Sequence, residues 1–554
     1  MLKSENDKGT IITNHDKDKA SSNTVTIDAN GKNDKVEVTL KDVNIDASRG
    51  SEAAVSVTGK GDTTIELDGD NELKSGAGHA GLEHNKTDTS GELTIQDKDN
   101  NGSLEAAGGF KGAGIGSAGS NDAQVKITGG NITATTSDDW GAGIGSGSYG
   151  TGTVEITGGE INATGGYLGA GIGGGCNGSG NVTISGGTIT AAGSDGAAGI
   201  GGGYYNGATV TITGDAVIKN ASSTKYGAGI GGGNGSDGNV TISGNAKIEN
   251  ATGGYGAAGI GGGAFSSPDK IGNGNVVIKD NAKIDNVQGG AYGAGIGGGI
   301  YGLSNVTIEG NTKVNATGGA GGAAIGGGAG AENNSDNNGN QITIKSNENG
   351  SPTINAVGGG TDEGEKIVIG GAGIGAGCES DADADITLEG KVTITATAGK
   401  DNVAIGANGI EQEFSGLAEG SSITRYDSEG NDITLPTDPV PAVPSSSGGS
   451  SADASVQESV FPGLVVTDKD GQRISYTSIR DNNVLSLRVG RFTASLRASL
   501  ATLRQLRAEG IDTITFQTIL CSTTLSVDEL LAMGGEDAEA VLTHRLTASS
   551  LTVG

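Results

Sequence analysis

Aromatic side chains recur at fixed distances from a glycine-rich block that repeats through the middle of this chain. Eleven of them lie between residues 110 and 410, each four or five residues from the isoleucine of a Gly-Ala-Gly-Ile-Gly block or a close variant of it. They are Phe110, Trp140, Tyr149, Tyr167, Tyr204, Tyr205, Tyr226, Tyr255, Phe265, Tyr292 and Tyr301. Sugar rings stack on aromatic faces, and tyrosine adds a polar tip. The residues after Phe110 are therefore predicted to bind carbohydrate in two ladders, and the alternative is that the rings pack coil on coil to brace the turns.

A second candidate site is an acidic segment ahead of the repeated blocks. Asp97, Asp99 and Asn101 are followed by Gly102, which fits the start of the calcium loop D-x-[DN]-x-[DN]-G. The twelfth position is Gly108 rather than glutamate, so the segment is not an EF-hand. Asp, Asn and Gly are also the residues of ordinary turns. The sequence leaves a structural calcium ion and a plain turn both open.

Catalytic chemistry finds little support in the repeat. None of the four histidines lies in the repeated blocks, and no arginine occurs between Arg49 and Arg425. Acidic residues are scattered over turns, whereas glycoside hydrolysis needs two carboxyl groups at a defined separation. We therefore predict no catalytic residues and a protein that is not an enzyme.

The repeat that must position these side chains has a period typical of a solenoid. Its isoleucines are Ile115, Ile144, Ile172, Ile200, Ile230, Ile260, Ile296, Ile325, Ile374 and Ile405. Eight of the nine intervals fall between 28 and 36 residues, and the interval from Ile325 to Ile374 is 49 residues and carries an insertion. In a solenoid each unit buries its apolar side against its neighbours, which requires the same residue types at the same phase.

Each repeat contains short segments with the alternation of β-strands. Val182 and Ile184 alternate with polar residues, and Ile189 lies in a second such segment. The glycine-rich block supplies a third, in which Ala and Ile share one face and the glycines take the other. We predict an all-β, three-sided parallel β-helix whose glycine face is a flat, bare strip between the aromatic ladders. A right-handed coil is expected from the general preference of parallel connections.

Composition divides the chain and limits its partners. We predict a flexible tail over residues 1–20, the β-helix over 21–434 with its glycine-block coils at 111–410, a Pro/Ser/Gly linker over 435–459 and a small α+β domain over 460–554. In the last domain we expect a hairpin around Asp470-Gly471, a helix within 493–510, a strand at 513–519 and a helix opened by Ser526. The net charge of −30 argues against nucleic acid and anionic membranes as partners.

Targeting and cysteine signals are sparse. No apolar run approaches transmembrane length, and the first residues contain no apolar signal core, so an export signal is expected outside this sequence. Cys176 and Cys378 have the same phase but lie six repeats apart. That separation is roughly 30 Å at the spacing of stacked strands, too far for a disulfide.

The repeat region resembles a family of bacterial carbohydrate-binding parallel β-helix surface proteins, known mainly from clostridia and related gut Firmicutes. The resemblance covers residues 21–410 and is carried by VEVTLKDVNIDAS (36–48), AAVSVTGKGDTTIELDGDNEL (53–73), GELTIQDKDNNGSLEAAGG (91–109) and the GAGIG blocks. It implies a cell-surface protein that binds plant-type polysaccharide such as cellulose or pectin, with structural calcium. This chain departs from the family pattern by extending the GAGIG coils far beyond a short domain.

We therefore expect a non-catalytic, extracellular or cell-surface protein that binds a plant cell-wall or host polysaccharide along its β-helix. A cell-surface protein is a further expected partner, and membrane insertion is not expected. One alternative is a structural stalk or adhesin that binds a protein partner or presents the C-terminal module. Another is a glycan-degrading β-helix enzyme.

Overall fold

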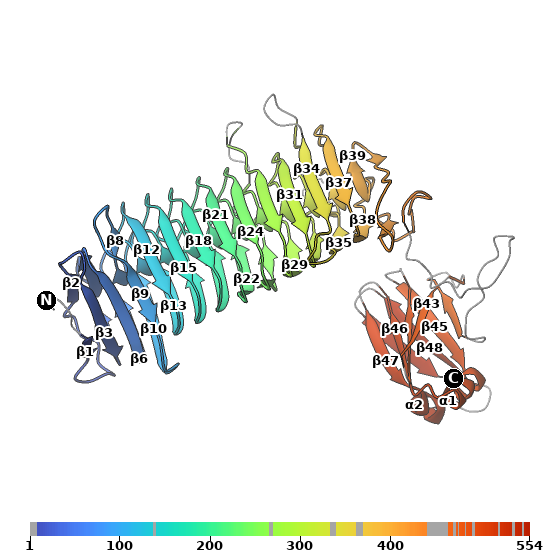
Figure 1. Ribbon diagram of the computed structural model, residues 1–554, viewed down its shortest axis with the longest axis horizontal. Coiled ribbons are helices and arrows are strands. Elements are labelled where there is room, and N and C mark those ends of the chain that lie inside the picture. The colour runs from blue at the N-terminus through green and yellow to red at the C-terminus, as the bar shows by residue number, and fades with distance from the viewer. Residues whose placement is uncertain are drawn as a thin grey trace. The chain divides into compact units, whose positions relative to one another are not determined.

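The structure is a computed structural model that describes residues 8–136, 140–264, 267, 270–332, 339–361, 369–439, 464–468, 473–474, 476–481, 483–489, 493–518, 521–533, 538–545 and 548–553. Its contacts divide the chain into two units, Met1–Glu429 with Ile433–Ala442, and Gly430–Asp432 with Val443–Gly554. The first unit is a β-solenoid and the second is a small fold of strands and two helices (Figure 1).

Three ladders of strands run along the solenoid, and we name them sheets A, B and C. Sheet A contains β2 (Val25–Ala29), β5 (Val55–Gly59), β7 (Leu82–Glu83), β11 (Ile115–Gly116), β14 (Ile144–Gly145), β17 (Ile172–Gly173), β20 (Ile200–Gly201), β23 (Ile230–Gly231), β27 (Ile260–Gly261), β30 (Ile296–Gly297), β33 (Ile325–Gly326), β36 (Ile374–Gly375), β39 (Ile405–Ala407) and β40 (Ile410–Glu411). All successive pairs are parallel except the last, in which β40 turns back on β39.

Sheets B and C join into one 27-stranded sheet because β6 pairs with strands of both. Sheet B contains β1 (Lys8–Thr13), β3 (Lys35–Lys41), β6 (Asp62–Lys74), β9 (Leu93–Gln96), β12 (Asp122–Ile127), β15 (Gly152–Ile156), β18 (Gly180–Ile184), β21 (Ala208–Ile212), β24 (Gly238–Ile242), β28 (Gly274–Ile278), β31 (Ser304–Glu309), β34 (Asn340–Lys345) and β37 (Ala384–Glu389), with the short β8 (Asn85–Lys86) antiparallel to β12. Sheet C contains β4 (Asn44–Asp46), the end of β6, β10 (Gly102–Gly108), β13 (Asn131–Thr136), β16 (Glu160–Thr164), β19 (Thr188–Gly193), β22 (Val217–Ser223), β25 (Lys247–Ile248), β26 (Ala251–Thr252), β29 (Lys283–Gln288), β32 (Lys313–Thr317), β35 (Thr353–Val357), β38 (Thr393–Thr397) and β41 (Ser422–Tyr426).

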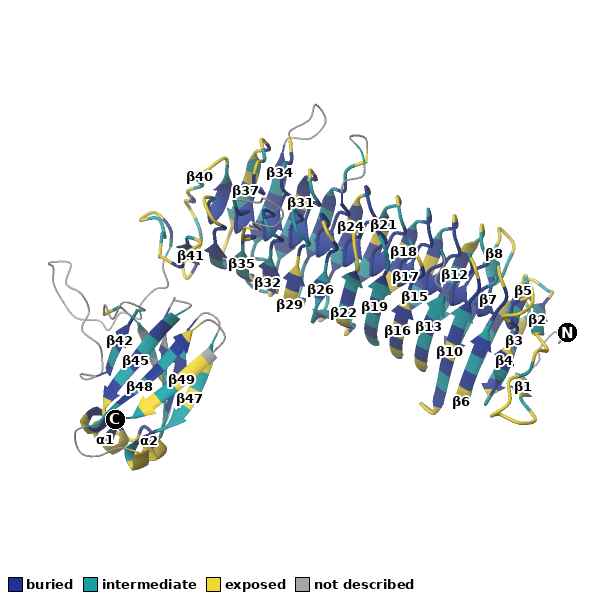
Figure 2. Ribbon diagram, turned by 180° about the vertical axis from the view of Figure 1, so that it is seen from behind, coloured by how far each residue is buried: buried dark blue, intermediate teal, exposed yellow. Residues whose placement is uncertain are grey.

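The predicted parallel β-helix is confirmed. Ile144 pairs with Ile172, which pairs with Ile200, so the isoleucines stack in one column. All of them are fully buried, and they form one continuous aliphatic core with the valines and isoleucines of sheets B and C. The buried and exposed residues alternate along the strands of sheets B and C (Figure 2). The right-handedness of the coil stays an expectation.

The glycine that follows each isoleucine is required by the backbone. Gly201 has a φ of +140°, and a Cβ built there would lie 2.0 Å from the carbonyl oxygen of Gly231 in the next coil. The column repeats this arrangement from Gly116 to Gly375. The close approach of neighbouring coils therefore excludes any side chain at this position.

Two predicted boundaries need correction. Residues 8–13, expected in a loose tail, form β1 and pair with β3, because Ile12 packs against the solenoid core. Residues 435–439, expected in the linker, lie against the last coil, where Ile423 donates its N–H to the Pro439 carbonyl oxygen. The rest of the predicted linker, residues 440–459, lies outside the described residues.

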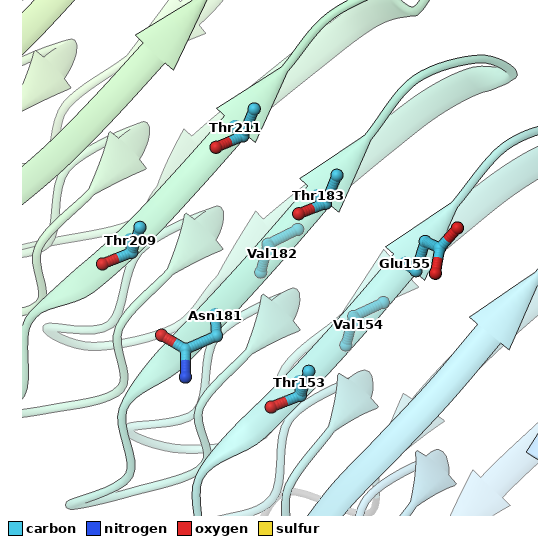
Figure 3. Close-up of a pocket in the computed structure, with 8 residues that line it drawn as sticks. All are labelled: Thr153, Val154, Glu155, Asn181, Val182, Thr183, Thr209 and Thr211. Carbon is cyan, nitrogen blue, oxygen red and sulfur yellow. The ribbon is translucent and has the colours of Figure 1, made fainter. Parts of the chain in front are cut away.

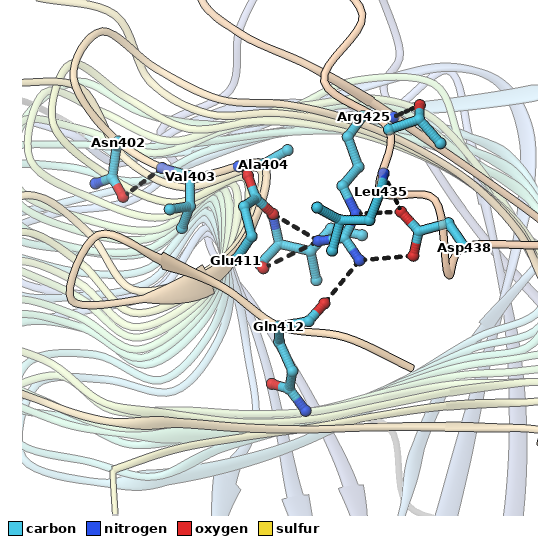
Figure 4. Close-up of polar contacts among 10 residues, drawn as sticks. Asn402, Val403, Ala404, Glu411, Gln412, Arg425, Leu435 and Asp438 are labelled. Carbon is cyan, nitrogen blue, oxygen red and sulfur yellow. Dashed lines mark hydrogen bonds and ion pairs between the residues drawn. The ribbon is translucent and has the colours of Figure 1, made fainter. Parts of the chain in front are cut away.

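The C-terminal end of the solenoid is sealed by a buried arginine (Figure 4). The Glu411 carboxylate accepts the N–H groups of Ala404 and Ile405, which in earlier coils donate to the next coil. Arg425 is fully buried and pairs with Glu411 at 2.5 Å and with Asp438 at 2.6 Å. This arrangement satisfies two sheet A backbone donors of the last coil, which a solenoid otherwise leaves open to other chains.

The second unit has two four-stranded sheets. One contains β42 (Leu464–Thr467), β45 (Thr493–Ser499), β48 (Glu539–Arg545) and β49 (Ala548–Val553), and the other contains β43 (Thr477–Asp481), β44 (Val484–Arg488), β46 (Thr513–Gln517) and β47 (Ser522–Ser526). The helices are α1 (Leu500–Ala508) and α2 (Val527–Met533). Among the described residues, no helix is both long enough and apolar enough to cross a membrane.

The predicted elements of this unit are confirmed in part. The strand in 513–519 is β46, and Ser526 precedes α2. The helix predicted within 493–510 is wrong in its first part, because Ala494, Leu496 and Ala498 alternate into the core as strand β45. Of the predicted hairpin, the structure shows an antiparallel bridge between Thr467 and Arg473, and Asp470-Gly471 lie outside the described residues.

Candidate ligand-binding site

Two loops flank each Ile-Gly strand of sheet A and lie against one another. We call the loop that enters the strand from sheet C the leading lobe, and the loop that leaves it for sheet B the trailing lobe. Within one coil, Ala170 donates its N–H to the Gly174 carbonyl oxygen at 2.9 Å, which ties the two lobes together. Between coils, Cys176 of a trailing lobe donates to the carbonyl oxygen of Trp140 in the preceding leading lobe at 2.7 Å.

This bond between coils recurs along the solenoid. In each case a backbone N–H of the trailing lobe donates to a backbone carbonyl oxygen of the preceding leading lobe. The donor and acceptor pairs are Tyr204 and Leu168, Ala264 and Tyr226, Ile300 and Gly256, and Ala329 and Tyr292. The lobes therefore cover the glycine-rich blocks, and residues 141–148 are all buried. The predicted bare glycine strip is wrong, because the extended part of each block is only two residues long and the chain folds outward on both sides of it.

The aromatic residues lie on these lobes, and those of the leading lobes contact one another along the solenoid. The ring centroids of Tyr226 and Tyr255 are 6.2 Å apart and those of Tyr255 and Tyr292 are 5.6 Å apart, with the rings edge to face. Phe110 and Trp140 are 5.7 Å apart, and the Lys111 ammonium lies above both rings. Contacts of this kind stabilise neighbouring coils, as the bracing hypothesis expects.

The tyrosines of the trailing lobes occupy a different position. Tyr149, Tyr205 and Tyr301 lie five residues after their isoleucines, with φ values of 66°, 62° and 61°. The same position has Gly235 and Gly330 in two other coils, both with a φ of 69°. In three further coils it has Ser120, Asn177 and Glu379, with φ values of 66°, 56° and 51°. A left-handed backbone is strained for any residue with a Cβ, so glycine is the residue that the turn itself favours.

Part of this tyrosine set is also packed. Tyr204 donates its hydroxyl to the Tyr205 hydroxyl at 2.7 Å, and burial, followed by this hydrogen bond, raises the pKa of Tyr204 to about 12. The ring of Tyr301 lies over Gly330, where a Cβ would meet its Cε1 atom at 2.7 Å. Lys270, from the inserted turn after Ile260, lies 4.1 Å from the Tyr205 ring centroid.

Nine of the ten predicted carbohydrate-binding residues lie within the described residues, and Phe265 lies outside them. Trp140, Tyr204 and Tyr292 are half-buried. The exposed ones are Tyr149 at 59%, Tyr167 at 48%, Tyr301 at 43%, Tyr255 at 42%, Tyr226 at 40% and Tyr205 at 36%. The structure thus brings rings from both lobes onto one side of the solenoid and leaves much of their surface open.

The acidic segment at residues 97–102 forms a tight turn between sheets B and C. Asp97 is buried, and its carboxylate accepts the N–H groups of Asn101 at 3.2 Å and Gly102 at 2.9 Å. Asp99 and Asn101 are exposed, and the described residues include no cluster of three or more His, Cys, Asp or Glu suited to a metal ion. Because both Asp97 oxygens serve backbone donors, the geometry supports the turn more directly, and calcium stays a prediction.

Two cysteines and one arginine of the solenoid are buried. Cys176 and Cys378 are buried free thiols, as their spacing predicts, and burial raises the pKa of each to about 11. The role of Arg425 at the end of the solenoid was missed by sequence reasoning. The sequence feature that could have indicated it is that Arg425 is the first arginine after Arg49.

Comparison with known proteins agrees with the fold. A family described as "Beta helix repeat" matches residues 125–148, 154–176, 182–204 and 240–264. Each matched segment runs from a sheet B strand through sheet C to the Ile-Gly strand and its trailing lobe, and so covers one coil. Searches of curated proteins and of solved structures found no match. The first unit is therefore a β-solenoid in which four coils match the β-helix repeat.

Proposed function

We propose that this protein binds a polysaccharide through the aromatic residues of its lobes and has no catalytic role. The observation that carries the proposal is the set of exposed tyrosines with a left-handed backbone, Tyr149, Tyr205 and Tyr301. Each costs about 1 kcal/mol relative to glycine at the same turn. Strain of this kind, where the chain itself uses glycine in other coils, indicates a role other than folding.

The arrangement of the rings suits a polymer. Lobes recur once per coil, at a spacing of about 4.8 Å along the solenoid axis. A periodic ligand can therefore contact several rings at once, and contacts that are weak singly add along one chain. The proposal includes a cell-surface or secreted location, where such polymers occur.

The decisive variant replaces Tyr149, Tyr205 and Tyr301 with glycine. The free energy of unfolding should stay nearly unchanged, because relief of the left-handed backbone offsets the loss of the Tyr205 and Tyr301 ring contacts. Affinity for the bound polysaccharide should fall about 100-fold, since each stacking contact contributes about 1 kcal/mol. Binding is measured on a panel of soluble neutral and anionic polysaccharides, and unfolding is followed by circular dichroism in denaturant.

The matched control is Asn177→Gly, which changes the same turn position, with a φ of 56°, in a coil without a ring there. It should leave affinity unchanged. Loss of stability without loss of binding in the triple variant would show that the rings brace the coils, and would contradict the proposal.

A second candidate function is a stalk or adhesin that presents the C-terminal module to a protein partner. The observation that favours it is the division of the chain into two units. Under this hypothesis the glycine variants keep all partner binding, and binding is lost when the second unit is deleted.

A further inference from the structure

The outward face of sheet B carries a strip without charge. Across β18, β21, β24, β28 and β31 its side chains are Asn181, Thr183, Thr209, Thr211, Asn239, Thr241, Asn275, Val277, Asn305 and Thr307, and we call these the neutral strip. The chain as a whole has a net charge of −30. In the same coils, the outward face of sheet C carries Lys219, Lys247, Lys283, Asp285 and Lys313.

The neutral strip is regular because the strands stack in register. Asn181 pairs with Thr209 and Thr183 with Thr211, and the alignment continues through the following strands. The strip has two rows, about 7 Å apart along the strands, and spans roughly 20 Å at about 4.8 Å per coil. Charged residues limit it at both ends. Lys126 and Glu155 pair at 3.0 Å on the two strands before it, and Glu309, at the end of β31, pairs at 3.4 Å with Lys345 of β34.

The first strands of the strip line a shallow groove together with Thr153 and Glu155 of the preceding strand β15. Thr153, Asn181 and Thr209 form one row and Glu155, Thr183 and Thr211 the other, with Val154 and Val182 behind them (Figure 3). The groove has a volume of about 330 Å³. Its first row continues into an aligned ladder, in which the Asn275 side-chain amide donates to the side-chain Oδ1 of Asn239 at 2.9 Å.

The chemistry of the strip fits an uncharged, hydroxyl-rich polymer. Threonine hydroxyls and asparagine amides both donate and accept hydrogen bonds. The free energy of desolvation is much smaller for uncharged polar groups than for ions. A ligand can therefore cover this face with a small desolvation penalty. A polyanion would meet the overall negative charge of the protein, and the nearest carboxylates, Glu155 and Glu309, repel it further.

We infer that the neutral strip is a second polysaccharide-binding surface, which selects a neutral chain lying along the solenoid axis. The inference shares the ligand class of the proposed function but rests on sheet B rather than on the lobes. Fixed, aligned rows of uncharged side chains need little reorganisation on binding, which favours a ligand with a regular repeat.

The test uses the full chain with hydroxyethyl cellulose, xyloglucan, arabinoxylan and galactomannan as neutral probes, and carboxymethyl cellulose and polygalacturonate as anionic ones. The wild-type protein should bind at least one neutral probe. If it binds the cellulose backbone, it should bind hydroxyethyl cellulose more tightly than carboxymethyl cellulose. Preference for the anionic probes, or no binding of any neutral probe, overturns the inference.

Variants of the strip then locate the surface. Replacing Thr183, Thr211 and Thr241 with valine removes hydroxyls at a position where Val277 shows that valine is accommodated. Affinity for the neutral probe should fall about tenfold or more, since each net hydrogen bond accounts for about fivefold. The corresponding lysine variants should reduce it further by placing charges in the strip.

The matched control is the aligned row on sheet C, with Thr133, Asn162 and Thr190 each replaced by lysine. It adds the same charge to three successive coils, the last of which is the coil of Thr183, and should leave binding unchanged. The inference is overturned if the sheet B and sheet C variants lose affinity equally, or if the sheet B variants lose none. The glycine variants of the lobes are measured in parallel, so that loss confined to them supports the lobes alone, and loss confined to the strip variants supports sheet B alone.

Discussion

The lobes outside sheet A and the open face of sheet B present two different kinds of surface on the same coils. On sheet B the strands are regular and unstrained, and each side chain has the direction that its strand position dictates. On the lobes, Tyr149, Tyr205 and Tyr301 are held in a left-handed backbone that glycine adopts more easily. The lobes therefore depart from what folding favours, whereas sheet B does not, and such departures concentrate at functional sites.

The largest expected difference between the two regions is in their tolerance of a single methyl group. Gly201→Ala should lower the free energy of unfolding by about 3 kcal/mol or more, because its φ is +140° and its Cβ would overlap the Gly231 carbonyl oxygen. Thr211→Ala, on the sheet B strand that follows Gly201, should change it by about 0.5 kcal/mol or less. Denaturant unfolding of the solenoid measures both, and similar values for the two would contradict the packing described for the lobes.

The free energy of unfolding should depend on pH through His84, which lies where the coils with lobes begin. His84 directly follows the sheet A strand β7, is 3% exposed, and has an Nδ1 atom without a hydrogen-bond partner. Burial, followed by the charge of Lys86, lowers its pKa from 6.5 to about 4. Above pH 6.5 the group is neutral in both states and contributes no pH dependence. As the pH falls from 6.5 towards 4, the unfolded state binds the proton first, and stability decreases.

At pH 5 the neutral burial of His84 should lower the free energy of unfolding by about 2 kcal/mol relative to pH 7. The measurement compares the loss of unfolding free energy between pH 7 and pH 5 in the wild type and in His84→Asn, in which every other titrating group is retained. The variant should lose about 2 kcal/mol less. Equal losses would show that His84 is not buried in its neutral form.

The leading lobes should differ from the trailing lobes in stability. Replacing Tyr226, Tyr255 and Tyr292 with alanine removes two edge-to-face contacts and should lower the free energy of unfolding by about 1 to 3 kcal/mol. The trailing-lobe glycine variants should lose none. Reversal of this order in thermal and denaturant unfolding would contradict the division between bracing rings and exposed rings.

The smallest effect concerns the turn that precedes the lobes. Asp97→Ala should lower the free energy of unfolding by about 1 to 2 kcal/mol, because two backbone donors lose their acceptor. Asp99→Ala should change it by about 0.5 kcal/mol or less, with or without chelator. A chelator-induced fall in melting temperature that Asp99→Ala abolishes would instead establish calcium at this turn.

The solenoid could be predicted from the sequence because its evidence is periodic. Isoleucine recurring at one phase through ten blocks determines a buried column, and Val182 with Ile184 determines an inward face. The lobes could not, because hydrogen bonds between coils, such as that from Cys176 to Trp140, join residues that share no local pattern. The first part of the predicted helix at 493–510 failed because Ala494, Leu496 and Ala498 also fit a strand, and pairing with β48 decided between the two.

The central claim, that polysaccharide lies on the lobes, can be followed through the single tryptophan of the chain. Trp140 lies on the leading lobe of the coil whose trailing lobe carries Tyr149, so its emission reports on ligand bound at the lobes of that coil. During titration with a polysaccharide that binds, the emission should shift to shorter wavelength with a saturable dependence, and quenching by acrylamide should decrease. Unchanged emission and quenching at concentrations that saturate binding would contradict the claim and place the ligand elsewhere on the protein.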